Sequence, residues 1–227
     1  MSSDNTQQRI IETAGPIFAA KGFEATTVRE ICRRAEVNLA AVNYHFGSKE
    51  GLYVATVREA HPDRLEQRLA PEFAPGTTPA ERLRGFVKVL LRRLLELNAT
   101  DWQWRLLLRE ITDPTPMCRE MLQEHFRSGF GALLAIVDEV VGPALPPHRR
   151  HQIALSVVGQ CVYYRSAASI VPMIVGEEEL AAHYDVEALT EHITRFSLAA
   201  LGLAPPITQR LSENGDRRPD VVTGAKR

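Results

Sequence analysis

The feature that most constrains the fold of this chain is a series of three closely spaced helix starts near its N-terminus. Thr27 stands three residues before Glu30, the spacing of a capping box, in which the hydroxyl accepts from the Glu30 amide and the carboxylate reaches back to the Thr27 amide. Asn38 and Ser48 are favoured N-cap residues for the next two helices. Two short helices joined by a tight turn, with a third supporting helix, are typical of the helix-turn-helix motif, which we predict here.

The rest of the chain also follows the helical period. Apolar residues recur three and four positions apart over most of its length, and the sequence has no convincing period-2 strand pattern. In the first helix, over residues 6–21, we expect Pro16 to bend the axis and Gly22 to end the helix. Further helices are expected at residues 79–98, 101–112, 121–141, 153–171 and 185–201. The sequence therefore predicts an all-α protein.

A proline-rich segment divides the chain. Four prolines fall within residues 61–79, and proline is unfavourable inside a helix. Residues 204–227 are rich in proline, glycine and charge without any periodicity, which is typical of a disordered tail. We therefore expect an N-terminal three-helix domain over residues 1–60, a larger helical domain over residues 61–203, and a disordered tail.

Composition limits the possible classes of protein. With 44% hydrophobic and 24% charged residues, the chain is ordinary for a globular protein. Its three cysteines, Cys32, Cys118 and Cys161, are far apart, which suits a reducing compartment and argues against a disulfide scaffold. The N-terminus lacks a secretory signal pattern, and no apolar run reaches the roughly 18 residues of a membrane span. We expect a cytoplasmic protein without a membrane partner.

The second of the three short helices, over residues 39–46, carries side chains that suit DNA bases. Asn43 offers the donor and acceptor pair that matches adenine or reaches a phosphate. Ala40 and Ala41 are short, so the backbone can approach the groove, and their methyl groups can meet a thymine methyl. Because the net charge of the chain is −1, a DNA-binding surface must come from sorting charges onto one face.

Neighbouring side chains suit the DNA backbone. Tyr44 and His45 can donate to phosphate oxygens, and Lys49 is a point charge in the first turn of the following helix. Thr27 lies where helix-start amides gather, which suits a phosphate, and Arg29 lies on the outward face of the same helix. Aromatic side chains in a short helix are also often core residues. A catalytic role for His45 has little support, since no Ser, Cys or Asp partner stands nearby.

The stretch "TTVREICRRAEVNLAAVNYHFGSKEGLY" resembles the DNA-binding signature of TetR-type (AcrR-like) transcriptional regulators, over residues 6–60. The resemblance implies an all-α homodimeric repressor: an N-terminal three-helix domain binds a palindromic operator, and a C-terminal helical domain binds a small effector and forms the dimer. Many members carry an aromatic residue where this chain has Asn43, a departure that bears on base preference. By position, the family's DNA contacts fall on Thr27, Arg29, Asn38, Ala41, Asn43, Tyr44, His45 and Lys49.

The C-terminal half contains two candidate effector-binding groups. Its segments "WQWRLLLREITDPTP" and "ALSVVGQCVYYR" resemble the CecR-like (YbiH-like) branch of the same family. Ligand pockets are mostly apolar with a few placed polar groups, which a first group, Trp102, Arg105, Arg109 and Glu110, provides on one helix. The alternative is that the tryptophan belongs to the core and that the arginines pair with surface acids.

The helix over residues 153–171 is apolar on nearly all sides, so it needs covering on all sides, and a partner subunit would supply that cover. We predict a homodimer through helices at about 148–171 and 185–201. Gln160, Tyr163 and Tyr164 form the second group, and they either line the effector pocket or fasten the dimer.

No motif in the sequence favours catalysis or a cofactor. His148 and His151 have a spacing able to hold a metal, but no cysteine or carboxylate stands at ligand spacing, and no nucleotide loop or triad occurs. We predict a DNA-binding regulator and not an enzyme, with no metal and no cofactor: a repressor that an effector releases from double-stranded operator DNA. A helical enzyme or small-molecule binding module with an incidental helix-turn-helix, and a TetR-type activator, are the alternative interpretations.

Overall fold

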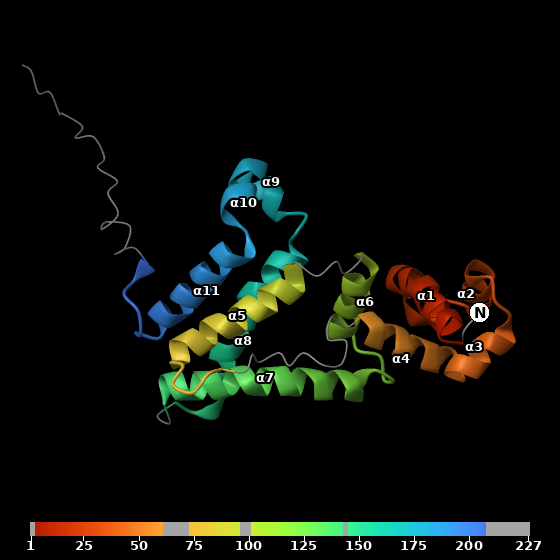
Figure 1. The fold of residues 1–227 in the computed structure, drawn as a ribbon, viewed down its shortest axis with the longest axis horizontal. Coiled ribbons are helices and arrows are strands. Elements are labelled where there is room, and N and C mark those ends of the chain that lie inside the picture. The colour runs from red at the N-terminus through yellow and green to blue at the C-terminus, as the bar shows by residue number, and fades with distance from the viewer. Residues whose placement is uncertain (1–2, 61–72, 96–100, 143–144, 208–227) are drawn as a thin grey trace, which may run out of the picture. The chain divides into compact units, whose positions relative to one another are not determined.

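The computed structural model of the protein describes residues 3–60, 73–95, 101–142 and 145–207. These residues form eleven α-helices, and no β-strand occurs among them (Figure 1). The all-α prediction is confirmed. The predicted tail lies outside the described residues from residue 208 onward, as does most of the proline-rich segment.

The helices form two compact units, of which unit 1 comprises the described residues within 1–70 and 95–132. Its helices, shown in red, orange and green in Figure 1, are α1 (Ser3–Ala25), α2 (Val28–Ala35), α3 (Leu39–Phe46), α4 (Lys49–Ala60), α6 (Asp101–Thr112) and the first part of α7 (Arg119–Val141). The first four pack on one another, and α6 packs against both α1 and α4. Unit 1 therefore combines the helix-turn-helix with a helix from much later in the chain.

Side-chain caps fix the three predicted helix starts. The side-chain oxygens of Thr27, Asn38 and Ser48 accept from backbone N–H groups three residues later, at 3.2, 2.9 and 3.1 Å. Only half of the expected capping box forms at Thr27, because the Glu30 carboxylate binds Lys21 Nζ at 2.7 Å instead. A hydrogen-bonded cation satisfies the carboxylate better than a neutral amide does.

The regular part of the first helix ends at Gly22, as expected. The backbone leaves the helical conformation there, with φ of 77° and ψ of 178°, and then resumes a helical turn that reaches Ala25. Pro16 lies inside the helix, but the helical backbone is interrupted at Gly22. A positive φ is accessible to glycine because it has no Cβ.

The core of unit 1 is aromatic and aliphatic. Tyr53 of α4 is buried, and its ring makes edge-to-face contacts with Phe18 and Phe23 of α1 at centroid distances of 4.8 and 5.2 Å. Ile31 of α2 and Val42 of α3 belong to the same core. The helices α1 to α4 thus share one hydrophobic cluster, which holds α3 in place.

Unit 2 comprises the described residues within 71–94 and 133–227. Its helices are α5 (Pro79–Leu95), the second part of α7, α8 (Pro147–Ser166), α9 (Val171–Val175), α10 (Glu177–His183) and α11 (Val186–Ala200). α8 packs on α11, and ion pairs join α5 to α11. No helix in the described ranges has an apolar stretch long enough to cross a membrane.

The boundaries of α8 differ from those expected. The helix begins at Pro147 and not at residue 153, because proline is tolerated in the first turn, where the N–H that it lacks would be unpaired anyway. The helix ends at Ser166, so the apolar segment continues as the separate α9.

The faces of α8 are also unequal. One face, with Ala154, Val157 and Cys161, is buried, whereas Leu155 and Tyr163 are 58% and 54% exposed in the single chain. The face that carries Leu155 and Tyr163 is therefore exposed in the single chain.

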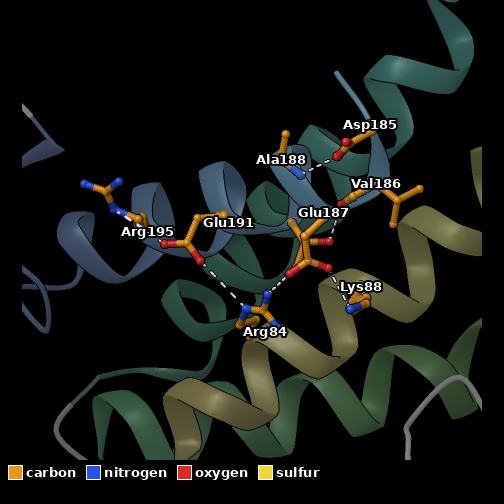
Figure 2. A network of polar contacts seen from close by, with 9 residues as sticks. Arg84, Lys88, Asp185, Val186, Glu187, Ala188, Glu191 and Arg195 are labelled. Carbon is orange, nitrogen blue, oxygen red and sulfur yellow. Dashed lines mark hydrogen bonds and ion pairs between the residues drawn. The ribbon is translucent and has the colours of Figure 1, made fainter. Parts of the chain in front are cut away.

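Four charged side chains join α5 to α11, as Figure 2 shows. Arg84 forms ion pairs with Glu187 and with Glu191, the latter at 3.7 Å, and Lys88 Nζ lies 2.6 Å from Glu187. The hydrogen bond from Lys88 is the main cause that lowers the pKa of the Glu187 carboxyl below its usual value. α11 begins just before this cluster, where Asp185 accepts from the Ala188 amide at 2.7 Å.

Candidate DNA-binding interface

One face of α3 is anchored in the core and the opposite face is exposed. Val42 is fully buried, whereas Tyr44 is 81% exposed and Leu39 is 51% exposed. Ala40 and Asn43 are exposed as well. Residues separated by one helical turn share a face, so these four exposed side chains form a single outward surface, which we call the α3 face.

Only some of the residues predicted to contact bases lie together on the α3 face. Ala40 and Asn43 lie on the α3 face, but Ala41 is half-buried and packs against the core of unit 1. Asn38, just before the helix, uses its side-chain oxygen to cap the Ala41 amide. Its amide NH₂ group is not used in this cap and can still donate to DNA, and the role of Asn38 as a contact stays a prediction.

Tyr44 and His45 are neighbours at the C-terminal end of α3. Their rings meet edge to face with centroids 5.0 Å apart, and His45 is half-buried while Tyr44 extends outward. The phenol of Tyr44 is therefore the more accessible donor for a phosphate oxygen.

Lys49 already has partners within the protein. Its Nζ donates to the carbonyl of Glu24 at 3.4 Å and lies 4.3 Å from the centroid of the Phe23 ring. Both partners lie at the C-terminal end of α1, where a cation is favoured by the helix dipole. Lys49 thus fastens the start of α4 to α1, and its predicted phosphate contact would add to that role.

The start of α2 combines a cap with a balanced set of charges. Thr27 is exposed as the N-cap, and Arg29 is exposed in the first turn. Glu30 forms ion pairs with Lys21 and Arg34, and the hydrogen bond from Lys21 is the main cause of the lowered pKa of its carboxyl. Because these cations neutralise Glu30, it does not impose an unpaired negative charge beside Arg29.

The seven predicted effector-binding residues fall in two different units. Trp102, Arg105, Arg109 and Glu110 lie on α6 in unit 1, whereas Gln160, Tyr163 and Tyr164 lie on α8 in unit 2. Their role in effector binding stays a prediction.

Glu110 is a buried carboxylate at the centre of a group of hydrogen bonds in unit 1. It is 1% exposed, and its carboxylate accepts from the Tyr53 hydroxyl at 2.6 Å and from the Thr115 amide and hydroxyl at 3.0 and 3.1 Å. Burial, followed by the bond to Glu110, raises the pKa of Tyr53 well above its usual value. Glu110 therefore links α4, α6 and the segment before α7.

Two glycines of α1 receive side chains from α6. A methyl group added at Gly15 would lie 2.5 Å from the Trp102 ring, and one added at Gly22 would lie 2.6 Å from Arg109 Nη2. Both pairs are seven residues apart on their own helices, so α1 and α6 meet in a matched register. The equal seven-residue spacing of the two glycines and of Trp102 and Arg109 was the only indication of this helix contact in the sequence. It can be interpreted only once α1 and α6 are known to touch.

The polar residues of α8 point in different directions. Gln160 donates to the Ser156 carbonyl of its own helix at 3.3 Å. Tyr163 is exposed, whereas Tyr164 is half-buried with its ring centroid 6.1 Å from that of Tyr184. Burial is the main cause that raises the pKa of Tyr164. Tyr163 therefore faces outward from unit 2, whereas Tyr164 packs beside Tyr184.

The histidine and cysteine residues form no cluster in the part of the chain that the structure describes. No group of three potential metal ligands occurs there, and His148 and His151 lie in the first turns of α8. All three cysteines are buried and free, and burial raises the pKa of Cys118 to about 11 and of Cys161 to about 12. A thiol with such a pKa is scarcely ionised near neutral pH.

Solved structures share the fold of this chain. A regulatory protein of the tetR family from Rhodococcus RHA1 superposes with a TM-score of 0.63 at 21% identity, covering 86% of this chain and 96% of that one. AibR, solved in complex with isovaleryl coenzyme A and operator DNA, superposes with a TM-score of 0.60 at 16% identity, covering 84% and 97%. At this identity the likeness concerns the fold alone.

Sequence relationships identify the family. The probable HTH-type transcriptional regulator YttP of Bacillus subtilis is 28% identical over 137 residues, which cover 60% of this chain and 64% of YttP, less than two thirds of its length. The model for bacterial regulatory proteins of the tetR family matches residues 10–56. The model for the C-terminal domain of the HTH-type transcriptional dual regulator CecR matches residues 79–201, more than half of the chain. The chain therefore belongs to the TetR family of transcriptional regulators, with a C-terminal domain of the CecR type.

Proposed function

We propose that this protein is a homodimeric repressor in the cytoplasm that binds a palindromic operator through α3 and leaves it when a small molecule binds. The observation that carries this proposal is the α3 face, with Tyr44 81% exposed on a helix whose opposite side is anchored by Val42. A recognition helix presents its N-terminal and outward side chains to the major groove. Ala40 and Asn43 are assigned to bases, and Tyr44 and His45 to phosphates.

The exposed apolar face of α8 supports a dimer. Leu155 and Tyr163 present apolar surface that one chain leaves uncovered, and burying apolar area is the main driving force of association. We assign residues 1–60 to DNA binding and residues 61–203 to effector binding and dimerisation. The dimer would form through the helices at about 148–171 and 185–201. Two recognition helices would then reach half-sites about 34–36 Å apart, one turn of B-DNA.

Effector control follows from linkage. AibR has been solved with both isovaleryl coenzyme A and operator DNA, which makes a small-molecule effector a reasonable proposal for this relative. An effector that favours a dimer with the wrong spacing of recognition helices must weaken DNA binding, and DNA must weaken effector binding by the same factor. α4 is the proposed lever, because Lys49 at its start touches α1 and Tyr53 binds Glu110 of α6.

The test is a mobility-shift assay with DNA from upstream of the protein's own gene, followed by selection of bound DNA from a random pool. Exchange of both Tyr44 and Lys49 for alanine is expected to abolish the shift while the helical circular dichroism is kept. Arg127→Ala is the matched control, since it removes an exposed cation from α7 of the same unit. Wild-type protein without DNA affinity at low salt would contradict the proposal.

The sign of regulation needs its own measurement, because binding geometry does not determine it. Deletion of the gene is expected to raise transcription from the promoter that carries the selected operator. A fall in transcription would instead identify an activator.

A further inference from the structure

Leu39 is an exposed residue of the α3 face to which the proposed function gives no role. It is the first residue of α3 and is 51% exposed, although leucine is among the residues most often buried. A single exposed leucine needs no explanation by itself. The position of Leu39 on the helix assigned to DNA recognition is what makes it informative.

The backbone around Leu39 is held firmly. Asn38 caps the helix at 2.9 Å, Val42 is fully buried in the core of unit 1, and the Gly47 amide donates to the Asn43 carbonyl at 2.9 Å. The side chain of Leu39 therefore leaves α3 from a fixed point. It shares a face with Asn43, which lies one turn further along.

The chemistry of leucine limits what it can read. It has no donor or acceptor, so it cannot recognise a base edge by hydrogen bonding and gains nothing next to a phosphate. The apolar group in the major groove is the 5-methyl of thymine. Residues at the N-terminal end of a recognition helix are the ones that approach base edges, and Leu39 reaches further from the helix than Ala40 does.

We propose that Leu39 is a specificity residue that selects thymine by packing against its 5-methyl group. This assignment rests on the proposed function and extends it. Asn43, with its match to adenine, would read a neighbouring base of the same half-site. Each half-site of the operator then contains a thymine whose methyl group contacts Leu39.

The test replaces individual thymines of a selected operator with deoxyuridine, which removes only the 5-methyl group, and measures dissociation constants by fluorescence anisotropy. At one thymine per half-site we expect the wild-type protein to lose affinity by about fourfold, the equivalent of one buried methyl group. Leu39→Ala is expected to bind more weakly to the thymine operator and to show no further loss with deoxyuridine. Leu39→Met keeps a long apolar side chain, so its affinity should still fall when thymine is replaced with deoxyuridine.

Circular dichroism melting of the Leu39→Ala variant controls for folding. The assignment is overturned if deoxyuridine has no effect at any position, or if Leu39→Ala keeps the wild-type loss at every sensitive thymine. It is also overturned if the sensitivity is lost with Ala40→Gly and kept with Leu39→Ala, because Ala40 would then be the reader. Failure to select any DNA is a different result, since it removes the proposed function itself.

Discussion

At the scale of single residues, two side chains of α6 lie against α1 where α1 has no side chain of its own. Gly15 lets the Trp102 ring lie against the backbone of α1, and Gly22 does the same for the Arg109 guanidinium. Neither glycine belongs to the helix-turn-helix motif. Both determine how closely α6 approaches the helices that carry it.

We predict that Gly15→Ala lowers the free energy of unfolding, although alanine is the better helix former. The new methyl group would lie 2.5 Å from the Trp102 ring, and overpacking of this kind costs about 1–3 kcal/mol. Thermal or urea unfolding followed by circular dichroism measures the change. Gly131→Ala on α7 is the control, because its methyl group would meet no described atom within 4 Å and should stabilise by up to about 1 kcal/mol. Equal effects of the two substitutions would refute the argument.

Tyr53→Phe is expected to destabilise the protein by about 1–3 kcal/mol, because it leaves the buried Glu110 carboxylate without its 2.6 Å donor. Tyr44→Phe, on the exposed α3 face, should leave stability unchanged. The pKa of Tyr53 is raised in the folded protein, so its contribution is complete below the unfolded pKa of about 10 and declines as pH rises above that value. The difference in unfolding free energy between wild type and Tyr53→Phe should therefore shrink above pH 10.

At the scale of elements, caps were easier to predict than ends. Thr27, Asn38 and Ser48 start helices as expected, since each cap depends on a contact only three residues away. The break at Gly22 was predicted, but not the helical turn that follows it and reaches Ala25. The start of α8 was predicted at residue 153, whereas the helix begins at Pro147, which fits its first turn. The outward position of Asn43 follows from helical period alone. The inward turn of Ala41 depends on the packing of α3 on its neighbours.

The α6 residues mark the limit of prediction from sequence. Their grouping on one helix was evident, but their partners lie on α1 and α4, some fifty to ninety positions earlier in the chain. No local pattern reports which helix a distant segment will meet. The short α10 was missed for another reason: its residues are exposed or half-buried, so it has no apolar stripe.

The charged pairs between α5 and α11 predict a salt-dependent and pH-dependent contribution to stability. Glu187→Gln removes the ion pairs with Arg84 and Lys88 and should lower the melting temperature at low salt, with a smaller effect at 1 M salt. The pKa of Glu187 is lowered, so its contribution is present above the unfolded pKa and is lost as pH falls through the folded value. Glu178→Gln on α10 is the control. If the melting temperature of Glu187→Gln falls equally at low and high salt, packing and not charge explains the loss of stability.

At the scale of the whole molecule, the exposed side of α8 predicts that oligomeric state and DNA affinity change together. Leu155→Asp should give a folded monomer, because Leu155 is 58% exposed in the single chain and its loss leaves the core intact. Sedimentation velocity measures the state, and the same samples should bind operator DNA at least tenfold more weakly, since two linked half-site contacts become one. Met173→Asp on α9, also at an exposed apolar position, is expected to remain dimeric. A dimeric Leu155→Asp variant would place the interface elsewhere.

The split composition of unit 1 has a consequence for recombining regulators. Gly15, Gly22 and Tyr53 precede residue 60, but Trp102, Arg109 and Glu110, which they meet, follow residue 100. A hybrid protein that joins this chain's first 60 residues to another regulator's C-terminal half would bring a foreign α6 against those three positions. We therefore expect a functional hybrid only when α6 is transferred together with the first 60 residues. Exchange at a single junction after residue 60 would leave the contacts of Gly15, Gly22 and Tyr53 unmatched.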